Sequence, residues 1–93
     1  MLCSITRTPQ FKRDAKALFK KHDKAEKLAE AVQELMAENK ELLTTKYRDH
    51  ALKGNWKGYR ELHIEGDWLL VCRVDREELV LVLTRTGSHD DLF

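Results

Sequence analysis

The spacing of apolar residues changes from a helical period in the first half of the chain to strand-like runs in the second. After a short mixed segment, Leu2–Thr6, the helical period begins at Thr8-Pro9 and again at Asp23. Threonine and aspartate accept hydrogen bonds from the free N–H groups of a first helical turn, and proline has no N–H that would need a partner there. The pattern predicts an edge strand followed by two helices, the first of which ends near His22.

Each predicted helix presents one apolar stripe. The stripes are formed by Phe11, Ala15, Leu18 and Phe19 in the first helix and by Ala25, Leu28, Ala29, Val32, Leu35 and Met36 in the second. The link between the helices is so short that we expect an antiparallel hairpin. An apolar stripe needs a partner surface, and the strands that follow are expected to provide it.

Three apolar runs predict strands at Tyr59–Ile64, Trp68–Val74 and Leu79–Thr86, joined by links of hairpin length. The last two runs are apolar at nearly every position, which is typical of central strands, but the pattern does not fix their register because both faces look buried. We predict an α+β fold in a single domain, residues 1–93. It comprises a strand, an antiparallel helix hairpin and a three-strand antiparallel meander, in one mainly antiparallel sheet.

Between Leu43 and Gly58 neither period is present, and aromatic residues alternate with basic ones. An irregular connection of this length in a small domain is usually functional or disordered. Large apolar side chains at Tyr47, Leu52 and Trp56 argue against disorder, because they can anchor the segment to the core. Within residues 46–60 the only acid is Asp49, and the basic residues are Lys46, Arg48, Lys53, Lys57 and Arg60. Such a segment can attract phosphates.

Composition limits the class of protein and its compartment. The 93 residues suffice for one modest core, and the net charge of +1 hides an uneven distribution, with residues 1–27 and 46–60 basic and residues 28–45 acidic. No apolar run is long enough for a signal peptide or a membrane span. Cys3 and Cys72 lack CxxC spacing and fall in predicted strands, where buried thiols are expected. We therefore expect a protein of the reducing cytoplasm.

Residues capable of chemistry stand at the ends of the predicted strands. His63 ends the first strand, Asp67 and Trp68 open the second, and Arg85 ends the third, with His89 following it. In an antiparallel meander the start of the second strand can lie beside the end of the third. That arrangement would gather Asp67, Arg85 and His89 at one rim of the sheet.

RNA cleavage without a metal needs a base for the 2′-hydroxyl, a cation for the charge on the phosphorane and an acid for the departing 5′-oxygen. Imidazoles suit the acid and base roles, a guanidinium suits the cation, and aromatic rings can stack on unpaired bases. All these types are present, although a single histidine at a strand end is more often structural. Metal binding is the rival interpretation. His50, His63, Asp67 and His89 are acceptable ligands, but no HExxH motif supports it, so we expect neither metal nor cofactor.

Two segments are highly specific when taken together. They are Asp49-His50-x-Leu52-x-Gly54-x-Trp56-x-Gly58-Tyr59-Arg60-x-x-His63-x-x-x-Asp67-Trp68 and Arg85-Thr86-Gly87-Ser88-His89-x-x-Leu92-Phe93. Both closely resemble the YafQ branch of the RelE toxin superfamily, and the resemblance runs over the whole chain. The sequence departs from the pattern at Gly66, where relatives often carry proline before the Asp-Trp pair.

The resemblance implies a RelE-like fold and a bacterial type II toxin. Such proteins enter the ribosomal A site and cut the messenger RNA displayed there, which inhibits translation. The resemblance also implies a cognate antitoxin as partner, in a hetero-oligomer. The alternative on the same scaffold is a non-catalytic toxin or binding module, as in relatives that inhibit gyrase.

The resemblance further implies roles for single residues. His50, His63, Asp67 and His89 would form the acid–base set, with His89 as general acid and one of the other three as base. Arg85 would stabilise the phosphorane. The residues that would hold the substrate, pack around it or contact RNA are Trp68, Phe93, Lys53, Lys57 and Arg60.

Overall fold

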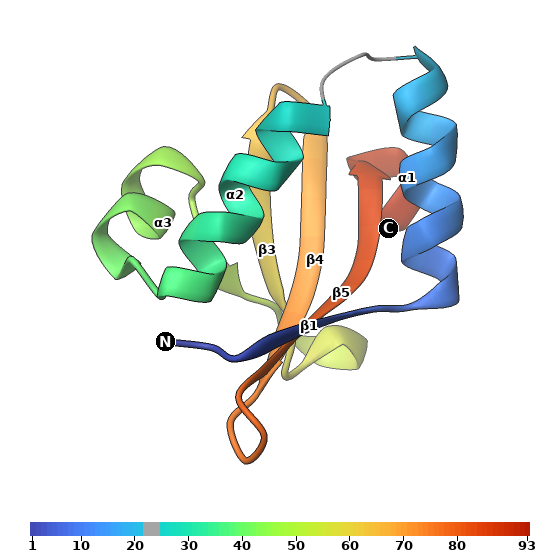
Figure 1. The fold of residues 1–93 in the computed structure, drawn as a ribbon. Coiled ribbons are helices and arrows are strands. Elements are labelled where there is room, and N and C mark those ends of the chain that lie inside the picture. Colours follow the sequence, from blue (N-terminus) through green and yellow to red (C-terminus); the bar gives the residue numbers. More distant parts are fainter. Residues whose placement is uncertain (22–24) are drawn as a thin grey trace.

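The computed structural model describes residues 1–21 and 25–93 (Figure 1). Its elements in chain order are β1 (Ser4–Arg7), α1 (Pro9–Lys21), α2 (Ala25–Ala37), α3 (Lys40–Lys46), β2 (His50–Ala51), the 3-10 helix η1 (Gly54–Trp56), β3 (Arg60–Glu65), β4 (Trp68–Asp75), β5 (Val80–Ser88) and α4 (His89–Leu92). The predicted cap at Asp23 and helix end at His22 lie outside the described residues. None of the helices described is long and apolar enough to pass through a bilayer.

The strands form one five-stranded sheet in the order β1-β5-β4-β3-β2. The β2–β3, β3–β4 and β4–β5 pairs are antiparallel, whereas β1 lies parallel to the first half of β5. The predicted α+β fold with a mainly antiparallel sheet is therefore confirmed. The predicted meander corresponds to β3, β4 and β5, whose ends lie within two residues of the predicted ones.

The register assigns side chains to the two faces of the sheet, because residues paired directly across antiparallel strands point to the same side. Glu61 of β3 pairs with Val71 of β4, and Val71 pairs in turn with Arg85 of β5. In the next row His63 pairs with Leu69. We call the side that carries these five residues the site face and the opposite side the helix face.

The helix face carries the main hydrophobic core. It is built around fully buried Leu62, Leu70 and Cys72 of the sheet, with Leu35 of α2 and Leu43 of α3 packed on them. Figure 1 shows α2 in front of the sheet and α1 beside β5, the two helices running in opposite directions as predicted.

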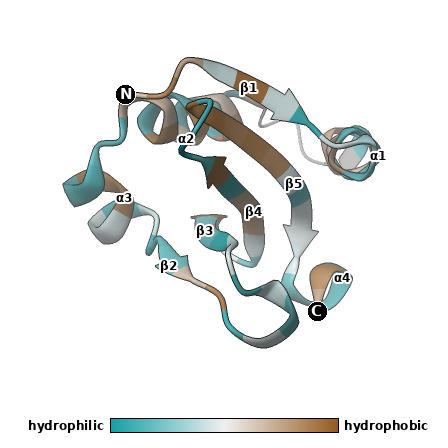
Figure 2. Ribbon diagram, turned by 90° about the horizontal axis from the view of Figure 1, so that it is seen from below, coloured by the Kyte–Doolittle hydropathy of each residue, from teal (hydrophilic) through white to brown (hydrophobic). Residues whose placement is uncertain are grey.

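A smaller apolar cluster covers part of the site face. It consists of Leu69, Val71 and Leu92, with half-buried Leu52, Trp56 and Tyr59 packed against it. In Figure 2 the segment after β2 and helix α4 lie on the side of the curved sheet away from α2. Central strands β4 and β5 are therefore covered on both faces, which explains their nearly continuous apolar sequence.

Beyond the end of β1, helix α1 lies along the edge of β5 and forms hydrogen bonds with it. The Thr8 hydroxyl donates a 2.7 Å hydrogen bond to the carbonyl of Thr84, and the Thr86 N–H donates a 3.3 Å hydrogen bond to the carboxylate of Asp14. The same Thr8 oxygen accepts a 3.0 Å hydrogen bond from the N–H of Phe11, which confirms the predicted start of the helix. These bonds hold α1 against the part of β5 that carries Arg85.

Four short elements, α3, β2, η1 and α4, were not predicted. The prediction that an irregular segment begins at Leu43 is wrong, because α3 continues to Lys46 and Leu43 is 1% exposed. The two residues of β2 are too few to show a period. Helix α4 is a single turn closed by a capping box, in which the Ser88 hydroxyl accepts from the N–H of Asp91 and the Asp91 carboxylate accepts from the N–H of Ser88.

The two cysteines behave differently. Cys72 is fully buried in the main core, and burial raises the pKa of its thiol to about 12, so it is an inert core residue as predicted. Cys3 is exposed, and the prediction that it is buried is wrong. It precedes β1, whose own residues are mostly exposed because β1 is an edge strand.

Candidate active site

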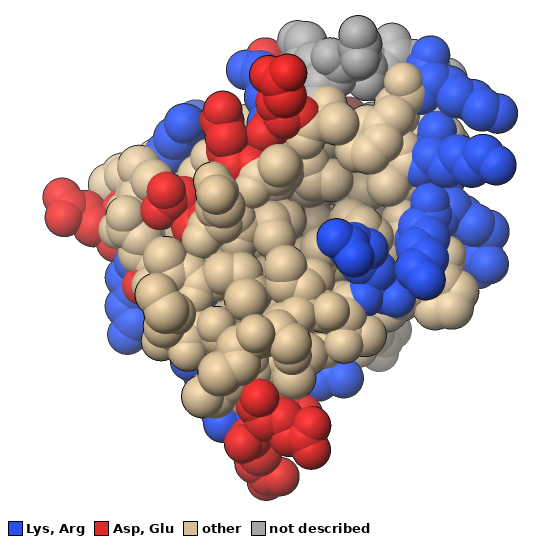
Figure 3. Space-filling model, viewed as in Figure 1, with Lys and Arg blue, Asp and Glu red and all other residues tan. Residues whose placement is uncertain are grey.

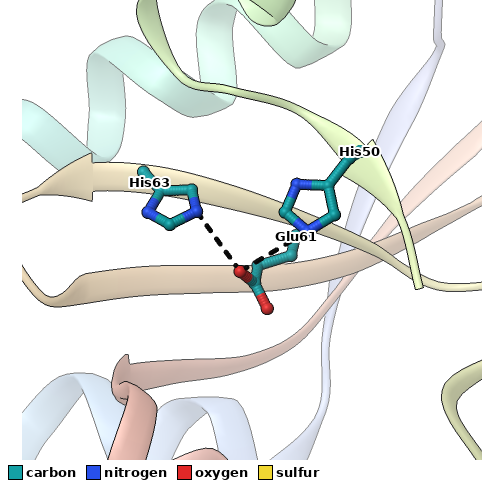
Figure 4. Close-up of side chains that lie close together, drawn as sticks. All are labelled: His50, Glu61 and His63. Carbon is teal, nitrogen blue, oxygen red and sulfur yellow. Dashed lines mark ion pairs between the residues drawn. The ribbon is translucent and has the colours of Figure 1, made fainter. Parts of the chain in front are cut away.

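Two imidazoles and a carboxylate meet on the site face where β2 pairs with β3. His50 is the direct partner of Glu61, and His63 lies two residues further along β3 on the same face. Nε2 of His50 is 3.7 Å from Oε1 of Glu61, and Nε2 of His63 is 3.4 Å from the same oxygen. Figure 4 shows the carboxylate of Glu61 placed between the two rings. We call these three residues the histidine–glutamate cluster.

The backbone fixes which nitrogen of His50 carries a proton. Nδ1 of His50 lies 2.8 Å from the carbonyl oxygen of Arg48. A carbonyl only accepts hydrogen bonds, so Nδ1 is the donor and carries a hydrogen. In the neutral ring Nε2 then has a free lone pair directed toward Glu61. That nitrogen can accept a proton from a substrate or bind a cation.

Glu61 is a site residue that was not predicted from the sequence. The side chain of Glu61 is 9% exposed, whereas the side chains of His50 and His63 are 50% and 34% exposed. A carboxylate that is almost removed from water needs hydrogen-bond donors or a cation beside it. The pattern Glu61-Leu62-His63, with one buried leucine between two polar residues, was the available signal, since alternate residues of a strand share a face.

A second group lies where β4 begins and β5 ends. Asp67, in the β3–β4 turn, accepts a 3.3 Å hydrogen bond from the backbone N–H of His89, the first residue of α4. The ring of His89 is 5.3 Å from that of Phe93, which in turn is 5.5 Å from the ring of Trp56. Phe93 is 46% exposed. Asp67 thus fixes the start of α4, and an exposed aromatic ring stands beside His89.

The predicted substrate residue Trp68 is part of the main core. It is 8% exposed, and its indole N–H donates a 2.8 Å hydrogen bond to the hydroxyl of Thr86. That hydroxyl donates in turn to the carbonyl of Leu69 at 2.8 Å. This position favours packing behind the site over stacking on a base.

Arg85 is held by a residue of α1 that was not predicted from the sequence. Asp14 of α1 accepts hydrogen bonds from Nε of Arg85 at 3.0 Å and from Nη2 at 3.1 Å. The hydrogen bonds that Arg85 donates to Asp14 raise the pKa of Arg85, so the guanidinium stays charged. Asp67, which was expected at the same rim, instead accepts a hydrogen bond from the N–H of His89.

The three predicted RNA-contacting cations differ in placement. Lys53 and Lys57 are exposed on either side of η1. Arg60 pairs with Cys72 across the strands and therefore lies on the helix face, away from the histidine–glutamate cluster. It forms an ion pair with Asp49, which raises the pKa of Arg60. This placement favours a structural role for Arg60.

The backbone at Gly66 does not fit the proline that relatives often carry at this position. Gly66 has φ +54°. Proline fixes φ near −65°, so it could not adopt this backbone. The β3–β4 turn that presents Asp67 therefore differs in conformation from a turn built with proline.

The candidate residues lie along one face and one end of the sheet. His50, Glu61, His63 and Arg85 share the site face, and Asp67 and His89 meet at its end. Strands β3 and β5 are separated by β4, so their backbones are about 10 Å apart. Imidazole, carboxylate and guanidinium groups therefore border the small apolar cluster of Leu69, Val71 and Leu92.

Comparison with known proteins identifies the family. The profile described as "Bacterial toxin of type II toxin-antitoxin system, YafQ" matches residues 3–93. The chain belongs to the YafQ toxin family. It is 38% identical to the mRNA interferase toxin YafQ of Escherichia coli K12 over 84 residues, which are 90% of this chain and 88% of that protein. The YafQ-type endoribonuclease assignment drawn from the sequence is confirmed at the level of the family.

Two solved structures extend the comparison with the YafQ family. The crystal structure of a metal-bound toxin from Helicobacter pylori is 40% identical, covers all of both chains and has a TM-score of 0.88. The crystal structure of the E. coli DinJ–YafQ complex is 36% identical, covers 96% of each chain and has a TM-score of 0.82. One relative therefore binds metal and another binds the partner DinJ.

Proposed function

We propose that this chain cuts messenger RNA in the ribosome by metal-independent acid–base catalysis. The observation that carries the proposal is the anchored ring of His50, whose free Nε2 faces Glu61 on the site face. A base at the histidine–glutamate cluster removes the proton of the 2′-hydroxyl. The 2′-oxygen then bonds to phosphorus, the bond from phosphorus to the 5′-oxygen breaks, and an acid returns a proton to that oxygen.

The other groups take the remaining roles. His89 is the acid, because its imidazole is exposed at the end of the site face beside the stacking surface of Phe93. Arg85 stabilises the negative charge of the phosphorane, with Asp14 holding its guanidinium in place. Lys53 and Lys57 attract the ribosomal and messenger RNA backbone. A cognate antitoxin, as in the DinJ–YafQ complex, holds the toxin off the ribosome.

Primer extension on a defined mRNA bound to purified ribosomes tests this function. We expect discrete cuts with 2′,3′-cyclic phosphate and 5′-hydroxyl ends, as required by attack of the 2′-hydroxyl. His89→Gln should slow cutting at least 100-fold, on the scale of general acid–base catalysis, whereas Asp90→Asn, at the next exposed position, should not. Cutting of the free RNA at the same rate would remove ribosome dependence. Stalled ribosomes on intact mRNA would favour the non-catalytic alternative.

A second candidate property is binding of a transition metal at the histidine–glutamate cluster. One ligand atom from each of His50, Glu61 and His63 lies within 4.8 Å of the others. Two imidazoles and a carboxylate suit Zn²⁺ or Cu²⁺, and His50 already donates its other ring N–H to a carbonyl, as metal-bound histidines usually do. The H. pylori relative is a metal-bound toxin.

Metal binding and base catalysis would compete for the same nitrogen lone pair of His50. Calorimetric titration with Cu²⁺ is expected to show one site, with the affinity lowered at least 10-fold in Glu61→Gln. Cleavage on ribosomes should continue in a chelator that removes transition metals and leaves Mg²⁺, which ribosomes need. Loss of cleavage in that chelator, with recovery on added Zn²⁺, would make the reaction metal-dependent and refute the metal-free route.

A further inference from the structure

Trp56 packs between two other aromatic rings at the edge of the candidate site. It lies in η1, between β2 and β3, and its side chain is half-buried. Its ring is 5.4 Å from the ring of Tyr59 and 5.5 Å from the ring of Phe93, and the interplanar angles are 81° and 70°. Edge-to-face packing at such distances is a favoured arrangement of two aromatic rings. Tyr59 therefore supports Trp56, and Trp56 supports Phe93.

Backbone hydrogen bonds and apolar packing hold the segment that carries Trp56. The N–H of Leu52 donates a 2.9 Å hydrogen bond to the carbonyl of Tyr59, which closes the segment at its base. The N–H of Tyr59 donates a 3.0 Å hydrogen bond to the carbonyl of Trp56. The side chains of all three residues pack against the small apolar cluster of the site face. Trp56 is thus anchored to the sheet and can hold a more mobile neighbour.

Helix α4 is too short to fix its own side chains. It has four residues, and a helix of that length is not stable without tertiary contacts. Its backbone is held by the hydrogen bond from the N–H of His89 to Asp67 and by burial of Leu92. The imidazole of His89 stays exposed, 5.3 Å from the exposed ring of Phe93. Among the described residues, the rings that Phe93 contacts are those of His89 and Trp56.

We propose that Trp56 is a positioning residue, which holds the ring of Phe93 against the imidazole of His89. The inference rests on the proposed function and adds to it the residue that places the acid beside the stacking ring. Without Trp56 the ring of Phe93 turns away into solvent, and the imidazole of His89 loses the neighbour that limits its rotation. An acid must lie within hydrogen-bond reach of the departing 5′-oxygen. A wider range of imidazole positions therefore slows the chemical step and leaves binding of the ribosome unchanged.

Cleavage kinetics on mRNA-loaded ribosomes, together with NMR of the imidazole of His89, test this role in the full chain. Trp56→Leu keeps an apolar side chain and removes the ring, so it should lower kcat roughly 5- to 10-fold, on the scale of one aromatic pair, with KM unchanged. Trp56→Phe keeps a ring and should stay within about twofold of wild type. In Trp56→Leu the ring signals of His89 should move toward those in Phe93→Leu, because the ring current of Phe93 no longer reaches them.

A double-mutant cycle shows whether Trp56 acts through Phe93. If it does, kcat of the double variant Trp56→Leu, Phe93→Leu should equal that of Phe93→Leu alone, because the second change removes a contact that is already lost. Losses that multiply would overturn the inference, since Trp56 would then act on the substrate directly. A Trp56→Leu enzyme with the kcat of wild type would overturn it as well.

Two control variants separate positioning from lost stability and from lost charge. Val74→Ala removes apolar contact with the main core and should leave kcat unchanged; a loss equal to that of Trp56→Leu would overturn the inference. Lys16→Gln removes one exposed charge from α1, along which Figure 3 shows Lys and Arg side chains gathered, and should raise KM without lowering kcat.

Trp56→Met, with a flexible apolar side chain, provides a second variant should Trp56→Leu fail to fold, and the same fall in kcat is expected. A wild-type chain that cuts no mRNA on ribosomes would refute the proposed function instead. The NMR comparison does not depend on activity, so unchanged ring signals of His89 in Trp56→Leu would overturn the positioning role by themselves.

Discussion

Replacing Asp14 with asparagine tests how α1 holds Arg85 on the site face. In the folded chain the Asp14 carboxylate accepts hydrogen bonds from Nε and Nη2 of Arg85 and from the N–H of Thr86, at 3.0, 3.1 and 3.3 Å. Asparagine has the same size but no charge, one acceptor oxygen and two N–H donors. The NH2 group of the amide would face a donor of Arg85 and could not accept its hydrogen bond. Part of the hydrogen-bond network is therefore lost without a change in side-chain volume.

The structure sets the expected loss of stability. A hydrogen bond to a charged group contributes roughly 1.5–3 kcal/mol when shielded from water. The side chains of Arg85 and Asp14 are 27% and 10% exposed, so solvent screening reduces this contribution. We expect Asp14→Asn to lower the free energy of unfolding at pH 7 by about 2 kcal/mol. In a domain of this size that loss corresponds to a fall in Tm of roughly 10 °C.

Urea unfolding at two pH values provides the assay. Burial alone would raise the pKa of Asp14, but hydrogen bonds from Arg85, Gln10 and Thr86 outweigh it and hold the pKa below its ordinary value of 3.8. A carboxyl group with a lowered folded-state pKa contributes stability above its unfolded pKa and loses it as the pH falls through the folded value. The stability gap between wild type and Asp14→Asn should therefore be complete at pH 7 and shrink below pH 3.8.

A matched control separates this contribution from a general effect of charge. Glu30→Gln removes one carboxylate from an exposed position of α2 and should change the free energy of unfolding by less than about 0.5 kcal/mol. Equal stability of wild type and Asp14→Asn at pH 7 would refute the reasoning. A gap that widens on acidification would refute it equally, because the linkage would then have the opposite sign.

The remaining predictions concern single groups at or behind the site. Arg85→Ala should raise the barrier to cleavage by about 3 kcal/mol, more than 100-fold in rate on ribosomes, as expected for loss of phosphorane stabilisation; an enzyme of full rate would remove that role. Trp68→Phe should cost about 1 kcal/mol of unfolding free energy in urea, because the indole hydrogen bond to Thr86 is lost. Gly66→Pro should lower Tm by several degrees, since its φ of +54° excludes proline, whereas an unchanged Tm would show that the turn is readily rebuilt.

The elements that could be predicted are those with a periodic spacing of apolar residues. Two helices and the three strands of the meander had long apolar patterns, and their ends were found to within a few residues. The short elements α3, β2 and α4 had no such pattern. Helix α3 depends on the cap at Asn39 and on burial of Leu43, and β2 depends on pairing with β3. Tertiary contacts decide such elements, so local sequence does not reveal them.

The types of residue in the candidate site could be predicted from the sequence, but not all of the residues that they contact. His63 and Arg85 were predicted because they stand at the ends of apolar runs, and His50 because of the motif in which it stands. Neither signal pointed to Glu61 and Asp14, the carboxylates that lie beside them. Glu61 is joined to His50 by a strand pairing, and Asp14 is separated from Arg85 by 71 positions. Strand register and long-range packing bring these groups together, and the local sequence pattern predicts neither.

The position of Asp14 links helix α1 to the site face. Phe11, Ala15 and Phe19 pack this helix against the main core, and Asp14 on the same helix accepts the hydrogen bonds of Arg85. A change that shifts α1 would therefore also shift the guanidinium, so the core residues of α1 help to position Arg85 although none of them stands on the site face.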